Sequence, residues 1–120
     1  MSAITEQSPL AEAVLSLDQA TFACTARGDA ATHPLDDLTT WHVDAVAVVV
    51  AADTLRAASR VPLPKLKDLD PVPTGGDPLE LVVAARDALE RVPDELNNPA
   101  LFLGRLRLHD ALAAVRSHYE

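Results

Sequence analysis

The side chains in this sequence that are best suited to chemistry lie near its carboxyl end. Arg105, His109 and Arg116 are spaced by four and seven residues, so they fall on one side of the helix expected from Asn98-Pro99 to about residues 117–120. Guanidinium groups hold anions through charged hydrogen bonds, and imidazole changes its charge near neutral pH. These three side chains together predict an anion-binding or acid–base site in which His109 is the titrating group. The alternative is that the arginine stems cover the helix edge and their heads pair with carboxylates.

A second group of candidates lies on the long helix expected over residues 34–60. His42 and Asp53 lie near one line of that helix but roughly 16 Å apart along its axis, so they cannot share a ligand. If buried, each needs a partner from another helix, and Asp53 is expected to pair with Arg105 or Arg116. A pocket between the two helices, covered by the proline-rich segment 61–76, would bind a small molecule. Its predicted ligand-binding residues are Trp41, His42, Asp53, Phe102, Arg105, His109 and Arg116.

Metal, cofactor and nucleophile chemistry find no support in the sequence. The four histidines are scattered, and neither Glu-x-x-His nor His-Glu-x-x-His occurs. Cys24 is the single cysteine and lies on the inward stripe of its helix, where cysteine is usually an inert small hydrophobic residue. No Gly-x-Ser-x-Gly or phosphate-binding glycine loop is present. We therefore expect no metal and no cofactor, assign no catalytic residue, and lean towards a protein that is not an enzyme.

The composition predicts one acidic globular domain spanning residues 1–120. Aromatic residues make up only 3% of the chain and hydrophobic residues 48%, which predicts an alanine-rich aliphatic core between closely packed helices. The net charge of −8 argues against nucleic acids, whose phosphates need a basic face, and against anionic membrane surfaces. It suits a basic protein partner. Arginine outnumbers lysine eight to two, a bias associated with high-GC bacteria, and the lack of a leader favours a cytoplasmic location.

Capping signals and helix breakers predict four helices and an all-α four-helix bundle. Ser8-Pro9 and Arg27-Gly28 mark the ends of the first helix, with Gly28 as a left-handed cap. The second spans residues 34–60. The third runs from the capping box at residues 77–80 to about Val92. The fourth carries the expected core stripe Leu101, Leu108, Leu112, Val115 and Tyr119. Residues 1–7 are expected to form a flexible arm.

The second helix has the widest apolar arc in the chain. Trp41, Val48 and Leu55 share one face, and further valines continue the arc around the side. We expect a central helix that is flanked by several neighbours or by a second copy of the chain. Ala47, Ala51 and Ala58, on the side expected to be polar, would permit another helix to approach closely. The apolar run is too short to span a bilayer and is bounded by aspartates.

The segment over residues 61–76 is expected to be a long connection between the second and third helices. Four prolines and two glycines exclude a long helix. Leu63, Leu66, Leu69 and Val72 recur every third residue, which is typical of an extended polyproline-like chain with one apolar edge. We expect that edge to lie against the bundle as the chain crosses from one end to the other. The alternative is a single helical turn over residues 65–69.

Three functions agree with these features. The leading hypothesis is a non-catalytic bundle that acts by protein–protein interaction, as a homodimer with a regulatory or accessory role. The alternative is a bundle that binds a small molecule, or acts on it, in the pocket described above. A further alternative, an acidic inhibitor or antitoxin-like protein, depends on the net charge alone.

Overall fold

The computed structural model describes residues 8–30, 37–59, 62–68, 76–93 and 97–119, and it confirms the all-α four-helix bundle. The helices are α1 (Pro9–Ala30), α2 (Asp37–Ala58), α3 (Pro78–Glu90) and α4 (Pro99–Arg116). Two short 3-10 turns accompany them, η2 (Leu66–Asp68) and η3 (Ser117–Tyr119). No strand occurs in these ranges. The arm expected at residues 1–7 lies outside them.

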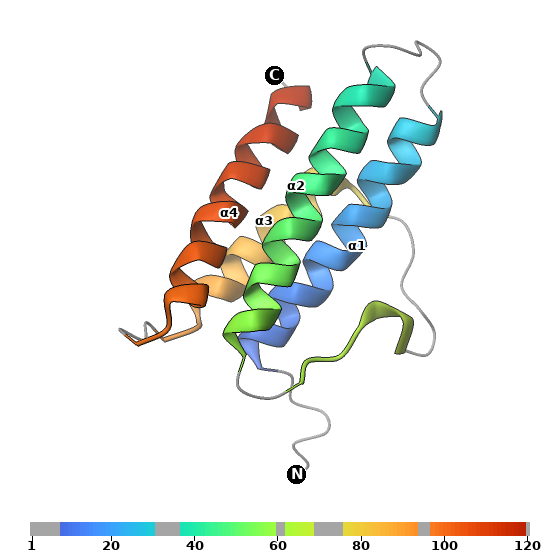
Figure 1. The fold of residues 1–120 in the computed structure, drawn as a ribbon. Helices are drawn as coiled ribbons and strands as arrows, with labels where there is room; N and C mark the ends of the chain where they lie inside the picture. The colour runs from blue at the N-terminus through green and yellow to red at the C-terminus, as the bar shows by residue number, and fades with distance from the viewer. Residues whose placement is uncertain (1–7, 31–36, 60–61, 69–75, 94–96, 120) are drawn as a thin grey trace.

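The helices follow one another around the bundle in the order α1, α2, α4 and α3, and neighbours run antiparallel (Figure 1). Arg27 near the end of α1 lies beside Asp77 at the start of α3, and Asn98 at the start of α4 lies beside Ala58 at the end of α2. The connection between α2 and α3 therefore crosses from one end of the bundle to the other, as predicted. α2 is flanked by α1 and α4, as expected, and its exposed residues Val43 and Val46 lie on a face that no helix of the described ranges covers.

The predicted helix starts are confirmed by their capping hydrogen bonds. The Ser8 hydroxyl accepts from the Ala11 amide at 3.1 Å. The Asp77 carboxylate accepts from the Glu80 amide at 3.1 Å, and the Asn98 side-chain oxygen accepts from the Leu101 amide at 3.1 Å. In each case a proline follows the cap, where its missing N–H costs nothing. The start of α2 falls next to residues 31–36, which lie outside the described ranges.

Three predicted boundaries need correction. α1 continues through Gly28 to Ala30, and Gly28 does not have a positive φ, so it is a helical residue and not a cap. α3 ends at Glu90, because the Arg91 and Val92 amides already bond back three residues to close the last turn. At the carboxyl end α4 gives way to the 3-10 turn η3, which leaves Tyr119 42% exposed and outside the core.

One core joins all four helices, and it is rich in alanine. Alanine accounts for 11 of the 25 buried apolar residues in the described ranges, and Trp41 is the one buried aromatic residue there. Ala51 and Ala58 belong to this core, so they do not lie on a polar side of α2 as expected. Small side chains allow a shorter distance between the axes of two packed helices, so α1 and α4 can approach α2 closely.

The connection after α2 combines the two predicted alternatives. Residues 62–65 are not helical and precede the single turn η2, whose Leu66 is buried. Leu63 packs against the core, and the Pro64 carbonyl accepts a hydrogen bond from Arg56 at 3.4 Å. This part of the connection is therefore attached to the bundle. Leu69 and Val72, predicted on the same apolar edge, lie outside the described ranges.

Two glycines mark the points where α2 comes closest to its neighbours. A Cβ atom placed on Gly104 of α4 would lie 2.8 Å from Leu55 Cγ, and Leu55 is fully buried. A Cβ atom on Gly28 of α1 would lie 2.7 Å from His42 Nε2, but the His42 side chain is 40% exposed. The first contact is confined by the core, whereas the second meets a side chain that can turn into solvent.

Gly104→Ala is expected to lower the free energy of unfolding by about 1–3 kcal/mol, because the added methyl group overpacks the core against Leu55. Gly28→Ala is the matched control, in which His42 moves aside and the helix gains up to about 1 kcal/mol from the better helix former. Urea denaturation of both variants measures the two effects. A Gly104→Ala protein as stable as its parent would contradict the close approach of α2 and α4.

Candidate functional site

Six side chains from α1, α2, the start of α3 and η3 meet at one end of the bundle. The His118 ring stacks on Trp41, with 3.7 Å between centroids and 9° between planes. The Tyr119 ring meets the same indole edge-on, with centroids 6.5 Å apart. The Arg27 guanidinium lies 5.3 Å from the Trp41 centroid, within the range of a cation–π contact. We call this group the terminal cluster: Arg27, Trp41, Asp44, Asp77, His118 and Tyr119.

A buried carboxylate forms the inner part of the terminal cluster. His118 Nε2 lies 2.5 Å from Asp44 Oδ2, and the two side chains are 14% and 6% exposed. A hydrogen bond joins the two side chains, and Nε2 is its donor wherever the carboxylate is ionised, because an ionised carboxylate only accepts. A buried charge that loses its partner is costly. The pair therefore holds the carboxyl-terminal turn against α2.

The outer part of the terminal cluster is built on Asp77, the cap of α3. Its Oδ1 atom accepts from the Tyr119 hydroxyl at 2.6 Å and from Arg27 at 3.1 Å. The Tyr119 hydrogen bond, helped by the Glu80 amide and the Arg27 charge, lowers the pKa of Asp77. Burial and the bond to Asp77 raise the pKa of Tyr119. One carboxylate thus connects the end of α1, the start of α3 and η3.

Cys24 lies behind the terminal cluster and takes no part in chemistry there. It is fully buried, as predicted from its place on the inward stripe of α1. Burial and then the charge of Asp44 raise the pKa of its thiol to about 12, although Arg27 opposes the shift. Because the thiolate is the reactive form of cysteine, this thiol is a poor nucleophile at neutral pH.

The predicted pocket residues do not come together between α2 and α4. Trp41 lies in the terminal cluster, whereas His42 contacts Gly28 and pairs with Asp29 at 3.2 Å. Phe102 and Arg116 are exposed on α4. The Asp53 side chain is 71% exposed and lies 3.9 Å from Arg56 on its own helix, so its predicted pairing with Arg105 or Arg116 is wrong.

Arg105 and His109 do line a groove, but it lies between α3 and α4. The groove has a volume of about 240 Å³. Leucines form its floor, and Arg105 is held at the rim because its Nη2 donates to the Val92 carbonyl at 2.9 Å. The residues that line the groove are Arg86, Leu89, Glu90, Arg105, Leu108, His109 and Leu112.

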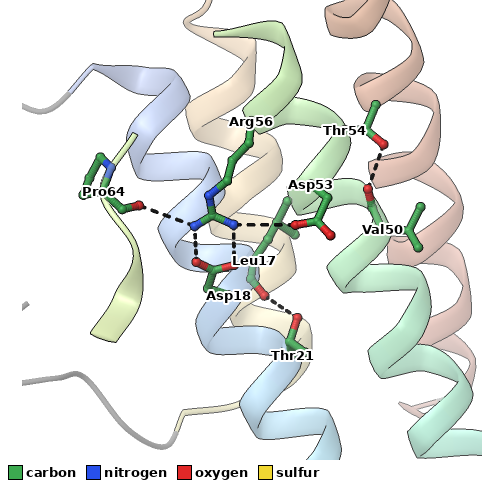
Figure 2. A network of polar contacts seen from close by, with 8 residues as sticks. All are labelled: Leu17, Asp18, Thr21, Val50, Asp53, Thr54, Arg56 and Pro64. Carbon is green, nitrogen blue, oxygen red and sulfur yellow. Dashed lines mark hydrogen bonds and ion pairs between the residues drawn. The ribbon is translucent and has the colours of Figure 1, made fainter. Parts of the chain in front are cut away.

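A second ion pair, between Asp18 of α1 and Arg56 of α2, holds the other half of the bundle (Figure 2). Two guanidinium nitrogens donate to the two carboxylate oxygens, and the side chains are mostly buried. The Asp18 hydrogen bond is the main reason that the pKa of Arg56 is raised. Arg56 also reaches the Pro64 carbonyl, so one side chain ties α1, α2 and the connection together.

The sequence interpretation missed the ion pairs of Asp18 and Asp44, although buried Asp44 carries a signal. Asp44 follows Trp41 by three residues and precedes Val48 by four, so helical spacing puts it next to the buried face of α2. A charge at such a position predicts a buried partner. His118 carries no comparable signal, because η3 ends the regular spacing of α4. Which basic residue reaches which carboxylate depends on the packing of different helices.

Comparison of the chain with family models, curated proteins and solved structures finds no match. Within the described ranges, none of the helices is long and apolar enough to cross a membrane. In the same ranges, no three or more His, Cys, Asp or Glu side chains are grouped so that they could hold a metal ion. The functional assignment therefore rests on the chemistry of the surfaces and grooves described above.

His118→Ala is expected to lower the free energy of unfolding by about 3 kcal/mol, because it leaves the Asp44 carboxylate buried without its partner. His109→Ala, at an exposed position of α4, is the matched control and should change stability by less than about 0.5 kcal/mol. Urea denaturation near neutral pH compares the two. Asp44→Asn should cost less in the His118→Ala background than in the parent. Equal costs in both backgrounds would show that the pair is not coupled.

Tyr119→Phe is expected to raise the pKa of Asp77 towards its ordinary value, because the hydroxyl that favours the carboxylate is lost. A lowered folded-state pKa contributes stability above the unfolded value, about 3.9, and that contribution disappears as the pH falls through the folded value. The stability difference between parent and variant should therefore be full near neutral pH and shrink in acid. NMR titration of the Asp77 carboxyl checks the pKa directly. An unchanged pKa would contradict the hydrogen bond.

Proposed function

We propose that this protein is a non-catalytic helical bundle that acts by protein–protein interaction and pairs with a second copy of itself through the outer faces of α2 and α4. The observation that carries the proposal is the apolar surface left on these two helices. Val46 is 59% exposed and Leu106 is 48% exposed, and Val43 and Leu103 are exposed as well. Several large apolar side chains exposed on one face are typical of an interaction surface.

A shallow groove joins α2 to α4 on the side where these two helices meet. Val43, Ala47 and Val50 recur at steps of four and three along α2, so they point the same way. Ala47 and Val50 also line a shallow groove together with Arg107 and Asp110 of α4. That groove connects the apolar row of α2 to the outer flank of α4. We call these residues the α2–α4 face: Val43, Val46, Ala47, Val50, Leu103, Leu106, Arg107 and Asp110.

The charges of the α2–α4 face favour a second copy as its occupant. The chain as a whole has a net charge of −8, but this face carries one positive and one negative side chain, Arg107 and Asp110. In a two-fold symmetric dimer, a residue that contacts another across the interface is contacted by it in return. Arg107 of each copy could then pair with Asp110 of the other. The remaining acidic surface stays available for a basic protein partner.

The sequence also led us to expect a regulatory or accessory role in a bacterial cytoplasm, and that setting stays a prediction. The small-molecule alternative has a separate observation in its favour, the groove between α3 and α4 that Arg105 and His109 line. The inhibitor or antitoxin-like alternative gains no support from the geometry of the described residues, because it depends on net charge alone.

Val46→Arg is expected to weaken the dimer by at least about tenfold in Kd, because it puts a charge into the apolar centre of the interface. Phe22→Arg is the matched control, since Phe22 is exposed on α1 and belongs to no part of the α2–α4 face. Sedimentation equilibrium measures the mass of each protein against 12.8 kDa for one chain. A parent protein that stays monomeric up to about 100 μM would refute the dimer.

A charge exchange tests the symmetry of the interface. Arg107→Asp and Asp110→Arg should each weaken the dimer, because each brings like charges together across the two-fold axis. The double variant should recover most of the lost affinity, because the pair is restored in the opposite sense. Failure of the double variant to recover would exclude this pairing, even if Val46→Arg had confirmed that the face is buried.

A further inference from the structure

Part of the connection after α2 packs against the outside of the bundle. Residues 62–68, which we call the strap, lie beside α1, and their turn η2 contacts that helix (Figure 1). Leu66 of the strap is 4% exposed and Leu63 packs against the core, whereas Lys65 and Lys67 are exposed. Side chains three residues apart share one edge both in a polyproline-type chain and in a 3-10 turn. The strap is therefore attached through its leucines.

The face of α1 beneath the strap is apolar and extends beyond it. Leu15 lies about 200° around the helix from the core residue Leu17, so it points away from the core, yet it is only 8% exposed. The helices that flank α1 are α2 and α3, so we assign the cover of Leu15 to the strap. Phe22 lies two turns further along the same line and is 63% exposed. A longer segment in the place of the strap would bury Phe22 as well.

Arg56 gives this face a polar anchor that the strap uses only in part. Its two terminal nitrogens hold Asp18, and Nη2 also donates to the Pro64 carbonyl, but at 3.4 Å (Figure 2). Arg56 Nε is the one buried side-chain nitrogen or oxygen in the described ranges that has no hydrogen-bond partner. A buried donor without a partner is costly. A backbone carbonyl that came closer to Nε would bind here better than the carbonyl of Pro64 does.

We propose that the strap is a built-in competitor for a basic, extended segment of a partner protein, rich in proline and leucine, that binds the same face of α1. The proposal rests on the proposed function in protein–protein interaction and gives the basic partner a surface separate from the α2–α4 face. The strap itself shows which chemistry this face accepts. Both lysines of the chain lie in it, although the net charge of the chain is −8. Opposite charges favour the encounter with such a segment.

Competition with the strap sets the affinity that a partner needs. The strap is tethered next to its binding face, which corresponds to an effective concentration on the order of millimolar. A strap that occupies the face about 90% of the time raises the apparent Kd of a partner about tenfold. A partner segment that also contacts Phe22 and bonds to Arg56 Nε gains interactions that the strap lacks. Extended proline-rich segments also lose little entropy when they bind next to aromatic side chains.

The experiment titrates the protein with a fluorescein-labelled peptide and follows the anisotropy. The peptide contains two copies of the strap sequence Pro-Leu-Pro-Lys-Leu-Lys, and at about 3.1 Å per residue it is long enough to cover Leu15 and Phe22 together. The double variant Leu63→Ser and Leu66→Ser releases the strap. We expect it to bind the peptide with a Kd below about 1 mM and at least about tenfold more tightly than the parent.

Matched controls separate the contributions. Pro62→Ser with Lys67→Ser changes two exposed residues of the strap but keeps its leucines, and this protein should bind the peptide like the parent. Phe22→Ser in the released protein should weaken binding about threefold or more, because the peptide loses an aromatic contact. A peptide with serine in place of leucine should not bind, and one with glutamate in place of lysine should bind more weakly.

Three outcomes would overturn the proposal: no saturable binding to the released protein up to about 5 mM peptide, equal affinities of the parent and the released protein, or equal binding of the serine peptide. Equal binding of the glutamate peptide would refute a basic partner. Thermal unfolding shows whether the double variant is folded, and Leu66→Ser alone decides the matter if it is not. All titrations use the Val46→Arg background, in which the proposed dimer is weakened. A failure of the dimer therefore leaves this test unaffected.

Discussion

The close approach of helices through small side chains is the constraint on which the rest of this structure depends. Nearly half of the buried apolar residues in the described ranges are alanines, and Gly104 lies against Leu55 where α4 crosses α2. Small side chains bury little apolar area each, so such a core gives less hydrophobic stabilisation per residue than a leucine-rich one. It gains contact by bringing backbones together, which leaves little tolerance for added atoms. The fit of α2 against α1 and α4 therefore fixes the geometry of every surface described above.

Two carboxylates, Asp44 buried and Asp18 partly buried, supplement this core, and each is held by a basic side chain from another element. Arg56 of α2 holds Asp18 of α1 in one half of the bundle, and His118 of η3 holds Asp44 of α2 in the other. Pairs of this kind contribute little net stability, because the desolvation of both charges offsets their attraction. Their loss is nevertheless costly, since a single buried charge then stays unpaired. We infer that the two pairs act mainly on register, because a shift of α2 along α1 would break the Asp18–Arg56 pair and a shift of α2 against η3 would break the Asp44–His118 pair.

The sequence predicts what is local and misses what depends on packing between helices. The capping residues Ser8, Asp77 and Asn98 were found because a cap and its amide donors lie within three residues. The buried face of α2 was predicted correctly because its apolar residues recur at helical spacing along the sequence. Gly28 was wrongly predicted as a helix cap, because glycine is used both to end helices and to let helices pack closely. Only the position of His42 against Gly28 shows that the second role applies here. The partners of Asp44 and Arg105 were out of reach, since 74 residues separate Asp44 from His118 and helical spacing does not tell which helices are neighbours.

The order of the helices explains why α4 can carry two separate surfaces. In this bundle α4 lies between α2 and α3, so its two flanks meet different helices and its remaining side faces solvent. A ligand in the α3–α4 groove would alter the α2–α4 face only by moving α4 against α2, and coupling between two sites requires such a shared movement. That movement is opposed where Gly104 meets Leu55 and where Asp44 holds His118. Both contacts lie on the α2 side of α4, whereas the Arg105 bond to Val92 lies on the α3 side.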